Sequence, residues 1–124
     1  MLQIFSIFIG GGIGAVLRYG AALLAGRCFG TALPGTLAVN VLGCLVMGAL
    51  CGLAQSRVGC LSEEARLFLT TGLLGALTTF STLNMELFAL LRSGRLTCAL
   101  VYLGVSLSLG LLATAAGYHF AQLR

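Results

Sequence analysis

Four long apolar stretches alternate along the chain with short segments that carry most of its charged residues. Residues 28–56 and 96–123 contain no arginine or glutamate, and the stretches before Arg27 and between Arg66 and Arg92 hold one charge each. About 20 helical residues cross the hydrocarbon core of a bilayer, where unpaired backbone groups are costly. The pattern predicts an all-α membrane protein with a single four-helix domain, residues 1–124, and spans near residues 2–26, 34–56, 66–91 and 96–120.

Composition supports a membrane protein and narrows its function. Hydrophobic residues make up 59% of the chain and charged residues 8%, with a mean hydropathy of +1.07, whereas soluble domains carry about 25% charged residues. Because lysine and aspartate are absent, the chain lacks the residues of a Walker-type, ATP-driven pump. Its seven arginines are scattered rather than clustered, so lipid is an expected partner and nucleic acid is not.

The five cysteines do not form a recognisable framework. They are odd in number, include no CxxC pair and are accompanied by a single histidine. Disulfide-linked domains and structural zinc sites both need more regular spacing. We therefore interpret the cysteines as small, soft packing residues.

The loop arginines bear on orientation in the membrane. One side receives three of them and the other side receives three: Arg57, Arg66 and Arg124 against Arg27, Arg92 and Arg95. The positive-inside rule gives no preference for such a chain. The count leaves open a single orientation and insertion in both orientations, the latter with pairing as an inverted-topology dimer.

Eighteen glycines are spread through the apolar stretches rather than gathered in linkers. Gly10 and Gly14 in the first stretch, and Gly48 and Gly52 in the second, have the spacing that lets two helix backbones approach closely. The spacing predicts tight helix packing along these two stretches.

The third stretch has the most unusual pattern, because glycine and hydroxyl residues crowd its middle. Gly75 is followed by Thr78, Thr79, Ser81 and Thr82, and such residues compete with helical hydrogen bonds. We expect the helix to break near Gly75–Thr79 and to restart near Ser81 or Thr82, one of which would cap it. Freed carbonyls suit a cation, and a restarted helix N-terminus suits an anion. The alternative is an unbroken helix whose hydroxyls bond back to its carbonyls.

Other polar residues inside the spans are candidates for ion contact. Asn40 offers amide hydrogens to an anion or makes an interhelical hydrogen bond, and the sequence leaves both open. Arg18 is interpreted as a topological anchor, or as a buried partner of Glu86 or of a carbonyl, in preference to an ion contact. Tyr102 and Ser106 lie four apart on one helix face, where they predict a polar track.

Three segments together resemble a known family along essentially the whole chain. They are GGGIGAVLRY, PGTLAVNVLG and TTGLLGALTTFSTLNMELF, in that order, and they resemble the Fluc (CrcB-type) fluoride channels. The resemblance implies an antiparallel, dual-topology homodimer in the cell (inner or plasma) membrane. It also implies a channel rather than an enzyme, which lets fluoride leave the cytoplasm passively, lowers fluoride toxicity and holds a central structural sodium ion.

The resemblance further implies roles for particular residues. The backbone carbonyls of Gly75 and Thr78 would bind sodium, and Arg18 would be the family's first-helix arginine, in a structural role. The fluoride path would be lined by Asn40, Phe80, Ser81, Thr82, Tyr102, Ser106 and Glu86. Two departures bear on that path: Leu83 stands where the family has a second phenylalanine, and Gly110 stands where its hydroxyl ladder continues.

Two other functions fit a four-helix membrane chain of this size. A small multidrug exporter couples proton entry to drug exit through a glutamate in its first helix, whereas this chain has Arg18 there. A degenerate structural partner in a heterodimeric channel would be consistent with Leu83. Both functions are alternatives to the fluoride channel.

Overall fold

The structure is a computed structural model that describes residues 1–55 and 61–123. Arg57, Cys60 and Arg124, together with residue 56 of the second predicted span, lie outside the described residues. The described chain contains four helices long and apolar enough to cross a membrane. The predicted all-α architecture with four long apolar helices is therefore confirmed. In chain order its elements are α1 Leu2–Phe29, α2 Leu33–Gln55, α3 Glu63–Leu67, the π-helix η1 Phe68–Leu74, α4 Gly75–Leu77, α5 Phe80–Arg92 and α6 Leu96–Gln122.

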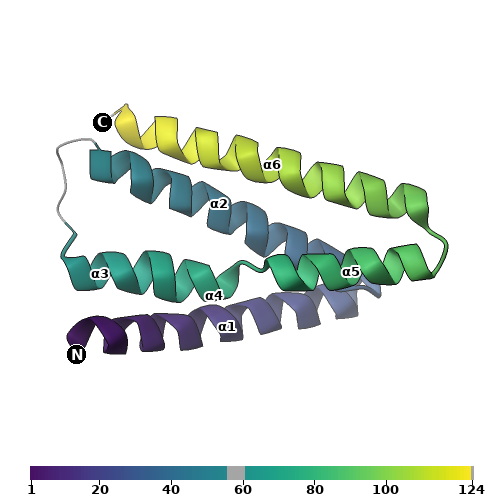
Figure 1. The fold of residues 1–124 in the computed structure, drawn as a ribbon, viewed down its shortest axis with the longest axis horizontal. Helices are drawn as coiled ribbons and strands as arrows, with labels where there is room; N and C mark the ends of the chain where they lie inside the picture. Colours follow the sequence, from purple (N-terminus) through teal and green to yellow (C-terminus); the bar gives the residue numbers. More distant parts are fainter. Residues whose placement is uncertain (56–60, 124) are drawn as a thin grey trace.

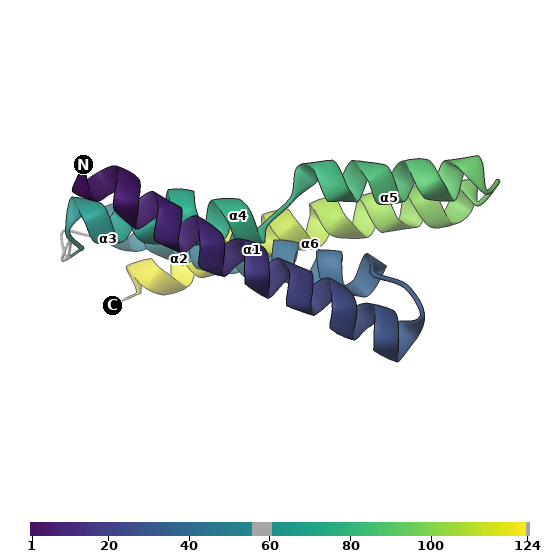
Figure 2. The ribbon, with the colours of Figure 1, turned by 90° about the horizontal axis from the view of Figure 1, so that it is seen from below.

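The long helices run back and forth along one axis. Figure 1 shows both chain ends at the same end of the bundle as the start of α3, with the α1–α2 and α5–α6 connections at the other end. Towards that other end, α5 and α6 diverge from α1 and α2 (Figure 2). Both tight connections use a glycine with positive φ, Gly30 at 70° and Gly94 at 72°, a conformation that residues with a Cβ rarely adopt.

Glycines bring α2 and α6 into backbone contact. A Cβ placed on Gly48 would collide with the carbonyl of Thr114, and one on Gly117 would collide with the carbonyl of Leu45. Gly52 faces the carbonyl of Tyr118 at 2.5 Å from its ideal Cβ position. These contacts set the register of the two helices.

A second glycine contact joins α1 to the third span. A Cβ on Gly14 would collide with the carbonyl of Leu73, and the ideal Cβ of Gly10 lies 2.5 Å from the carbonyl of Phe68. Gly72 in η1 completes the contact, because its own Cβ position lies 2.9 Å from the carbonyl of Ile7. The first stretch thus packs closely against the third span, and the second stretch packs closely against α6, in each case through the predicted glycines. The prediction of tight packing along these two stretches is confirmed.

The third span changes its backbone conformation between α4 and α5. Thr78 (φ −81°, ψ 150°) and Thr79 (φ −150°, ψ 118°) are extended, whereas Gly75 on the near side is helical (φ −61°, ψ −35°). The span as a whole bends by only 12°. Two residues therefore leave the helical conformation while the parts on either side keep nearly one direction.

The residue that caps α5 differs from the prediction. Thr79, rather than Ser81 or Thr82, is the N-cap, and its hydroxyl accepts a hydrogen bond from the backbone N–H of Thr82. The reason is geometric: an N-cap needs extended backbone and a side-chain oxygen three residues before the N–H that it satisfies. Thr79 meets both conditions, whereas Ser81 and Thr82 already lie inside the helix.

Candidate functional site

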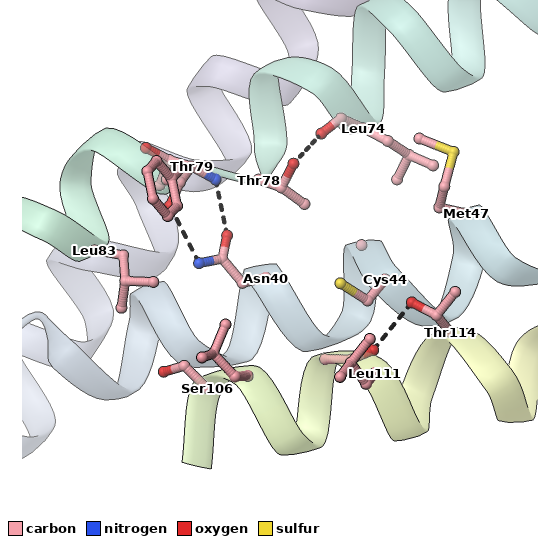
Figure 3. A pocket seen from close by; sticks show the side chains of 14 residues that line it. Asn40, Cys44, Met47, Leu74, Thr78, Thr79, Leu83, Ser106, Leu111 and Thr114 are labelled. Atoms are coloured by element: carbon pink, nitrogen blue, oxygen red, sulfur yellow. Dashed lines mark hydrogen bonds between the residues drawn. The ribbon is translucent and has the colours of Figure 1, made fainter. Parts of the chain in front are cut away.

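A cavity of about 390 Å³ lies between α2, the α4–α5 junction and α6. Figure 3 shows its lining side chains converging from the three helical segments. It is lined by Asn40, Gly43, Cys44, Met47, Leu74, Thr78, Thr79, Phe80, Leu83, Ser106, Leu107, Gly110, Leu111 and Thr114. None of these residues carries a formal charge, so any polar ligand in the cavity would meet amide, hydroxyl, thiol and aromatic groups.

Asn40 pairs reciprocally with the backbone of Thr79. Its Oδ1 accepts a hydrogen bond from the Thr79 N–H at 2.8 Å, and its Nδ2 donates to the Thr79 carbonyl at 3.2 Å (Figure 3). The amide therefore has an interhelical role, and one of its two N–H groups stays available within the described structure. Of the two possibilities that the sequence leaves open for Asn40, the interhelical hydrogen bond is present.

The hydroxyl of Thr79 organises the start of α5. It accepts from the Thr82 N–H at 3.1 Å and donates to the Thr82 hydroxyl at 3.0 Å. The Ser81 hydroxyl lies 3.3 Å from the same oxygen. Thr79 is 8% exposed, so these hydrogen bonds satisfy a hydroxyl that water hardly reaches.

These two pairings redirect backbone donors at the junction. In an α-helix the Thr79 N–H would bond to the Gly75 carbonyl, and the Thr82 N–H would bond to the Thr78 carbonyl. Here the first donor goes to Asn40 and the second to the Thr79 side chain. The carbonyls of Gly75 and Thr78 therefore lose their usual helical partners.

Three residues spaced four apart on α6 line the cavity beside α2, and two of them carry hydroxyls. Ser106 lines the cavity, and its hydroxyl is buried without a hydrogen-bond partner among the described residues. Gly110 follows one turn later, and the Sγ of Cys44 lies 3.5 Å from its ideal Cβ position. Thr114 donates its hydroxyl hydrogen to the Gly110 carbonyl at 3.0 Å. Ser106 is thus the hydroxyl of this face that is free to bind a ligand.

Glu86 belongs to a separate cluster outside the cavity. Its two carboxylate oxygens accept hydrogen bonds from Thr36 and Tyr102, each at 2.7 Å. Thr36 is 4% exposed. The cluster joins α2, α5 and α6. Glu86 and Tyr102 are not among the residues that line the cavity, whereas Ser106 is.

Arg18 lies beside a second, smaller cavity. This space of about 270 Å³ is lined from α1, α2 and α5, with Arg18, Thr36 and Thr82 among its residues. Within residues 1–55 and 61–123 no ion pair joins Arg18 to Glu86, whose carboxylate is occupied by two hydroxyl donors. The structural role of Arg18, as a topological anchor or as a partner of Glu86 or of a carbonyl, stays a prediction.

The structure brings only some of the predicted site residues together. Asn40, Thr78, Phe80 and Ser106 line one cavity, where Phe80 is 76% exposed. The other predicted site residues do not line this cavity: Gly75, Ser81, Thr82, Tyr102, Glu86 and Arg18. Gly75 is exposed. The sequence did not point to Cys44 or Thr36 as site residues. Each lies four residues from Asn40, and this spacing, which places residues on the same helix face, could have indicated them.

Comparison with known proteins decides the family. The family described as CrcB-like protein, Camphor Resistance (CrcB), matches residues 5–118. The chain belongs to the CrcB-like family. That match includes every residue that lines the main cavity. The family resemblance found from the three sequence segments is confirmed.

Curated relatives of the chain are named as fluoride-specific ion channels FluC. One from Chloroflexus aurantiacus (strain ATCC 29366 / DSM 635 / J-10-fl) is 49% identical, over 94% of this chain and 93% of the relative. One from Methylobacterium sp. (strain 4-46) is 42% identical, over 95% and 94%. One from Salinibacter ruber (strain DSM 13855 / M31) is 44% identical, over 94% and 87%. Together with the four apolar helices, these relatives identify the chain as a multi-pass membrane protein of a non-enzymatic family.

Proposed function

We propose that the chain forms a fluoride-selective channel in the cell (inner or plasma) membrane, through which fluoride leaves the cytoplasm passively and fluoride toxicity is reduced. The relatives named as fluoride-specific channels support this function. The observation that carries it is the uncharged cavity at the α4–α5 junction, lined by Asn40, Phe80 and Ser106. A small anion that sheds water needs replacement contacts, but a fixed positive charge would hold it too tightly for release.

The free groups of this cavity suit a small anion. Asn40 retains one amide hydrogen beyond its bond to Thr79, and the buried Ser106 hydroxyl has no partner among the described residues. The edge of the Phe80 ring is electropositive because the ring's electron density is concentrated on its faces. Three weak, neutral contacts of this kind allow binding and release in quick succession.

The functional unit in this proposal is an antiparallel homodimer of chains inserted in both orientations. Phe80 and Ser81 are exposed at the middle of a membrane span, where polar groups need protein or water around them. A second copy would cover this surface and complete the path from the other side. The equal number of loop arginines on the two sides is consistent with insertion in both orientations. Four of these six arginines lie within the described residues: Arg27, Arg66, Arg92 and Arg95.

Sodium is the proposed structural ion of that dimer, and the junction residues fit it. The carbonyls of Gly75 and Thr78 have lost their usual backbone donors, and hard cations prefer oxygen ligands of this kind. Gly75 is exposed, so its carbonyl lies where a second copy could supply a matching pair. When bound, sodium would supply a positive charge that these carbonyls of both copies could bind, and it would thereby link the third spans of the two copies.

Ion flux from liposomes separates the fluoride channel from its alternatives. Purified protein should release fluoride passively and much faster than chloride. Proton-coupled drug transport would instead support the small multidrug exporter, and a lack of either activity would support the structural partner. Fluoride efflux no faster than chloride efflux would refute the proposed selectivity.

A single substitution tests whether Asn40 lies on the ion path. Asn40→Asp keeps the size of the side chain and introduces a negative charge into the cavity. Because an anion is repelled by that charge, we expect fluoride efflux to fall by at least about tenfold, the equivalent of about 1.4 kcal/mol. Unchanged efflux in this variant would remove Asn40 from the path.

A further inference from the structure

The extended residues at the α4–α5 junction are held by side chains from two elements. Asn40 on α2 occupies both backbone hydrogen-bonding groups of Thr79, and Thr79 itself occupies the N–H of Thr82. Thr78 is anchored on the other side, since its backbone N–H and hydroxyl both donate to the Leu74 carbonyl. The junction is therefore specified by hydrogen bonds from named side chains.

From these contacts we infer that Asn40 and Thr79 are positioning residues that create the cation site by keeping backbone donors away from its carbonyls. This inference rests on the sodium site of the proposed function. Asn40 holds the donor that would otherwise occupy the Gly75 carbonyl, and the Thr79 hydroxyl holds the donor that would otherwise occupy the Thr78 carbonyl. One side chain therefore serves each carbonyl.

Removal of either side chain would free a competing N–H. Without the Asn40 amide, the Thr79 N–H has no partner at this depth, and the nearest carbonyl in helical register is that of Gly75. An unpaired backbone donor away from water costs about 1–3 kcal/mol, so the helical bond would re-form. A carbonyl that accepts an internal hydrogen bond is a poorer ligand, and affinity for sodium would fall.

Asn40 also lines the main cavity, so one position is shared by the anion path and the cation site. The two roles use different atoms. Oδ1 accepts the Thr79 N–H, whereas the free hydrogen on Nδ2 is the group offered to the anion. Substitutions that keep the acceptor but change the donor should separate the roles.

The test is equilibrium binding of radioactive sodium to purified full-length protein in detergent, with choline chloride holding ionic strength constant. Wild type should bind sodium saturably. Asn40→Ala should weaken sodium binding by about tenfold, since it releases the Thr79 N–H. Asn40→Asp should bind sodium at least as tightly as wild type, since its carboxylate still accepts that N–H.

Asn84→Ala serves as the matched control. Asn84 is the other asparagine of the chain, and its amide donates to the Phe80 carbonyl within α5 at 2.9 Å. It does not touch the junction donors, so sodium binding should be unchanged. The inference is overturned if Asn40→Ala binds sodium as wild type does, or if Asn40→Asp loses as much affinity as Asn40→Ala.

A second pair of variants keeps the inference testable if Asn40→Ala does not fold. Thr79→Val removes the capping hydroxyl at nearly constant volume and should weaken sodium binding, whereas Thr79→Ser restores the hydroxyl and should recover it. Equal sodium affinity in the two variants would contradict the inference, because a purely steric role would not distinguish them in this way.

Fluoride flux in liposomes distinguishes this inference from the proposed function. If wild type binds sodium with the expected variant pattern but conducts no fluoride, the fluoride-channel proposal fails and the positioning roles stand. If wild type conducts fluoride but binds no sodium, the positioning inference fails and the channel proposal stands.

Discussion

Helix α2 contacts its neighbours in two different ways. Against α6 it uses glycine, so that backbone meets backbone at Gly48, Gly52 and Gly117. Against α5 it uses side-chain hydrogen bonds, from Asn40 to Thr79 and from Thr36 to Glu86. The first contact sets the distance and register of two regular helices, and the second holds a stretch of backbone that is not helical.

The difference shows where a membrane protein needs polar side chains in its interior. Regular helices satisfy their own backbone, so the α2–α6 contact needs only small residues and close approach. The α4–α5 junction leaves backbone groups without helical partners, and side chains from α2 must supply some of them. We therefore expect steric changes to dominate at α2–α6, and changes in hydrogen bonding to dominate at α2–α5.

The largest expected effect is that of Gly48→Ala. The added methyl group would collide with the Thr114 carbonyl, and backbone cannot move aside as a flexible side chain can. We expect a loss of about 3 kcal/mol or more in stability, measured as a drop in thermal unfolding midpoint in detergent. Gly26→Ala is the control, because no atom lies within 4 Å of its Cβ position. Equal midpoints for the two variants would contradict the steric account.

An intermediate effect is expected for Thr36→Val, which removes a part-buried hydrogen bond of the buried Thr36 side chain at nearly constant volume. The change leaves one oxygen of Glu86 without its donor at 2.7 Å, and an unpaired buried polar group costs about 1–3 kcal/mol. Thermal unfolding of the purified variant measures the loss. Thr114→Val is the matched control, since that hydroxyl is exposed and bonds only within its own helix. If Thr114→Val lowers the unfolding midpoint as much as Thr36→Val does, the loss does not depend on burial of the hydroxyl, and this account is contradicted.

The smallest effect is expected for Tyr118→Phe, which tests a side-chain hydrogen bond inside the glycine-packed pair. The Tyr118 hydroxyl donates to Gln55 Oε1 at 2.5 Å, in an exposed position near the end of α2. Because water can replace an exposed hydrogen bond, we expect a loss of about 0.5 kcal/mol. A double-mutant cycle with Gln55→Ala isolates the pair. A coupling energy above about 1.5 kcal/mol would mean that side chains, as well as glycines, stabilise the α2–α6 contact.

Much of the architecture follows from local patterns in the sequence. Long apolar stretches between isolated charges predict four membrane-length helices, and the spacing of Gly10 with Gly14 and of Gly48 with Gly52 predicts close packing. These features depend on residues within a few turns of one another. The resemblance carried by TTGLLGALTTFSTLNMELF likewise depends on a continuous segment.

The partners of individual polar groups did not follow from the sequence. Crowded hydroxyls indicated an irregular third span, but not that Thr79 would be the cap or that Asn40 would bind its backbone. Nor did the sequence show that hydroxyls of Thr36 and Tyr102 would donate to the Glu86 carboxylate. Each of these outcomes depends on which faces of separate helices meet.

The sequence alone determined that this chain crosses a membrane as four helices, because hydrophobicity, helix length and glycine spacing are properties of neighbouring residues. The tertiary structure alone decided which side chains hold the α4–α5 junction. Asn40 and Thr79 lie 39 residues apart, and Thr36 and Glu86 lie 50 apart. Their contacts form only after helix register is set, and no periodicity within one helix encodes that register.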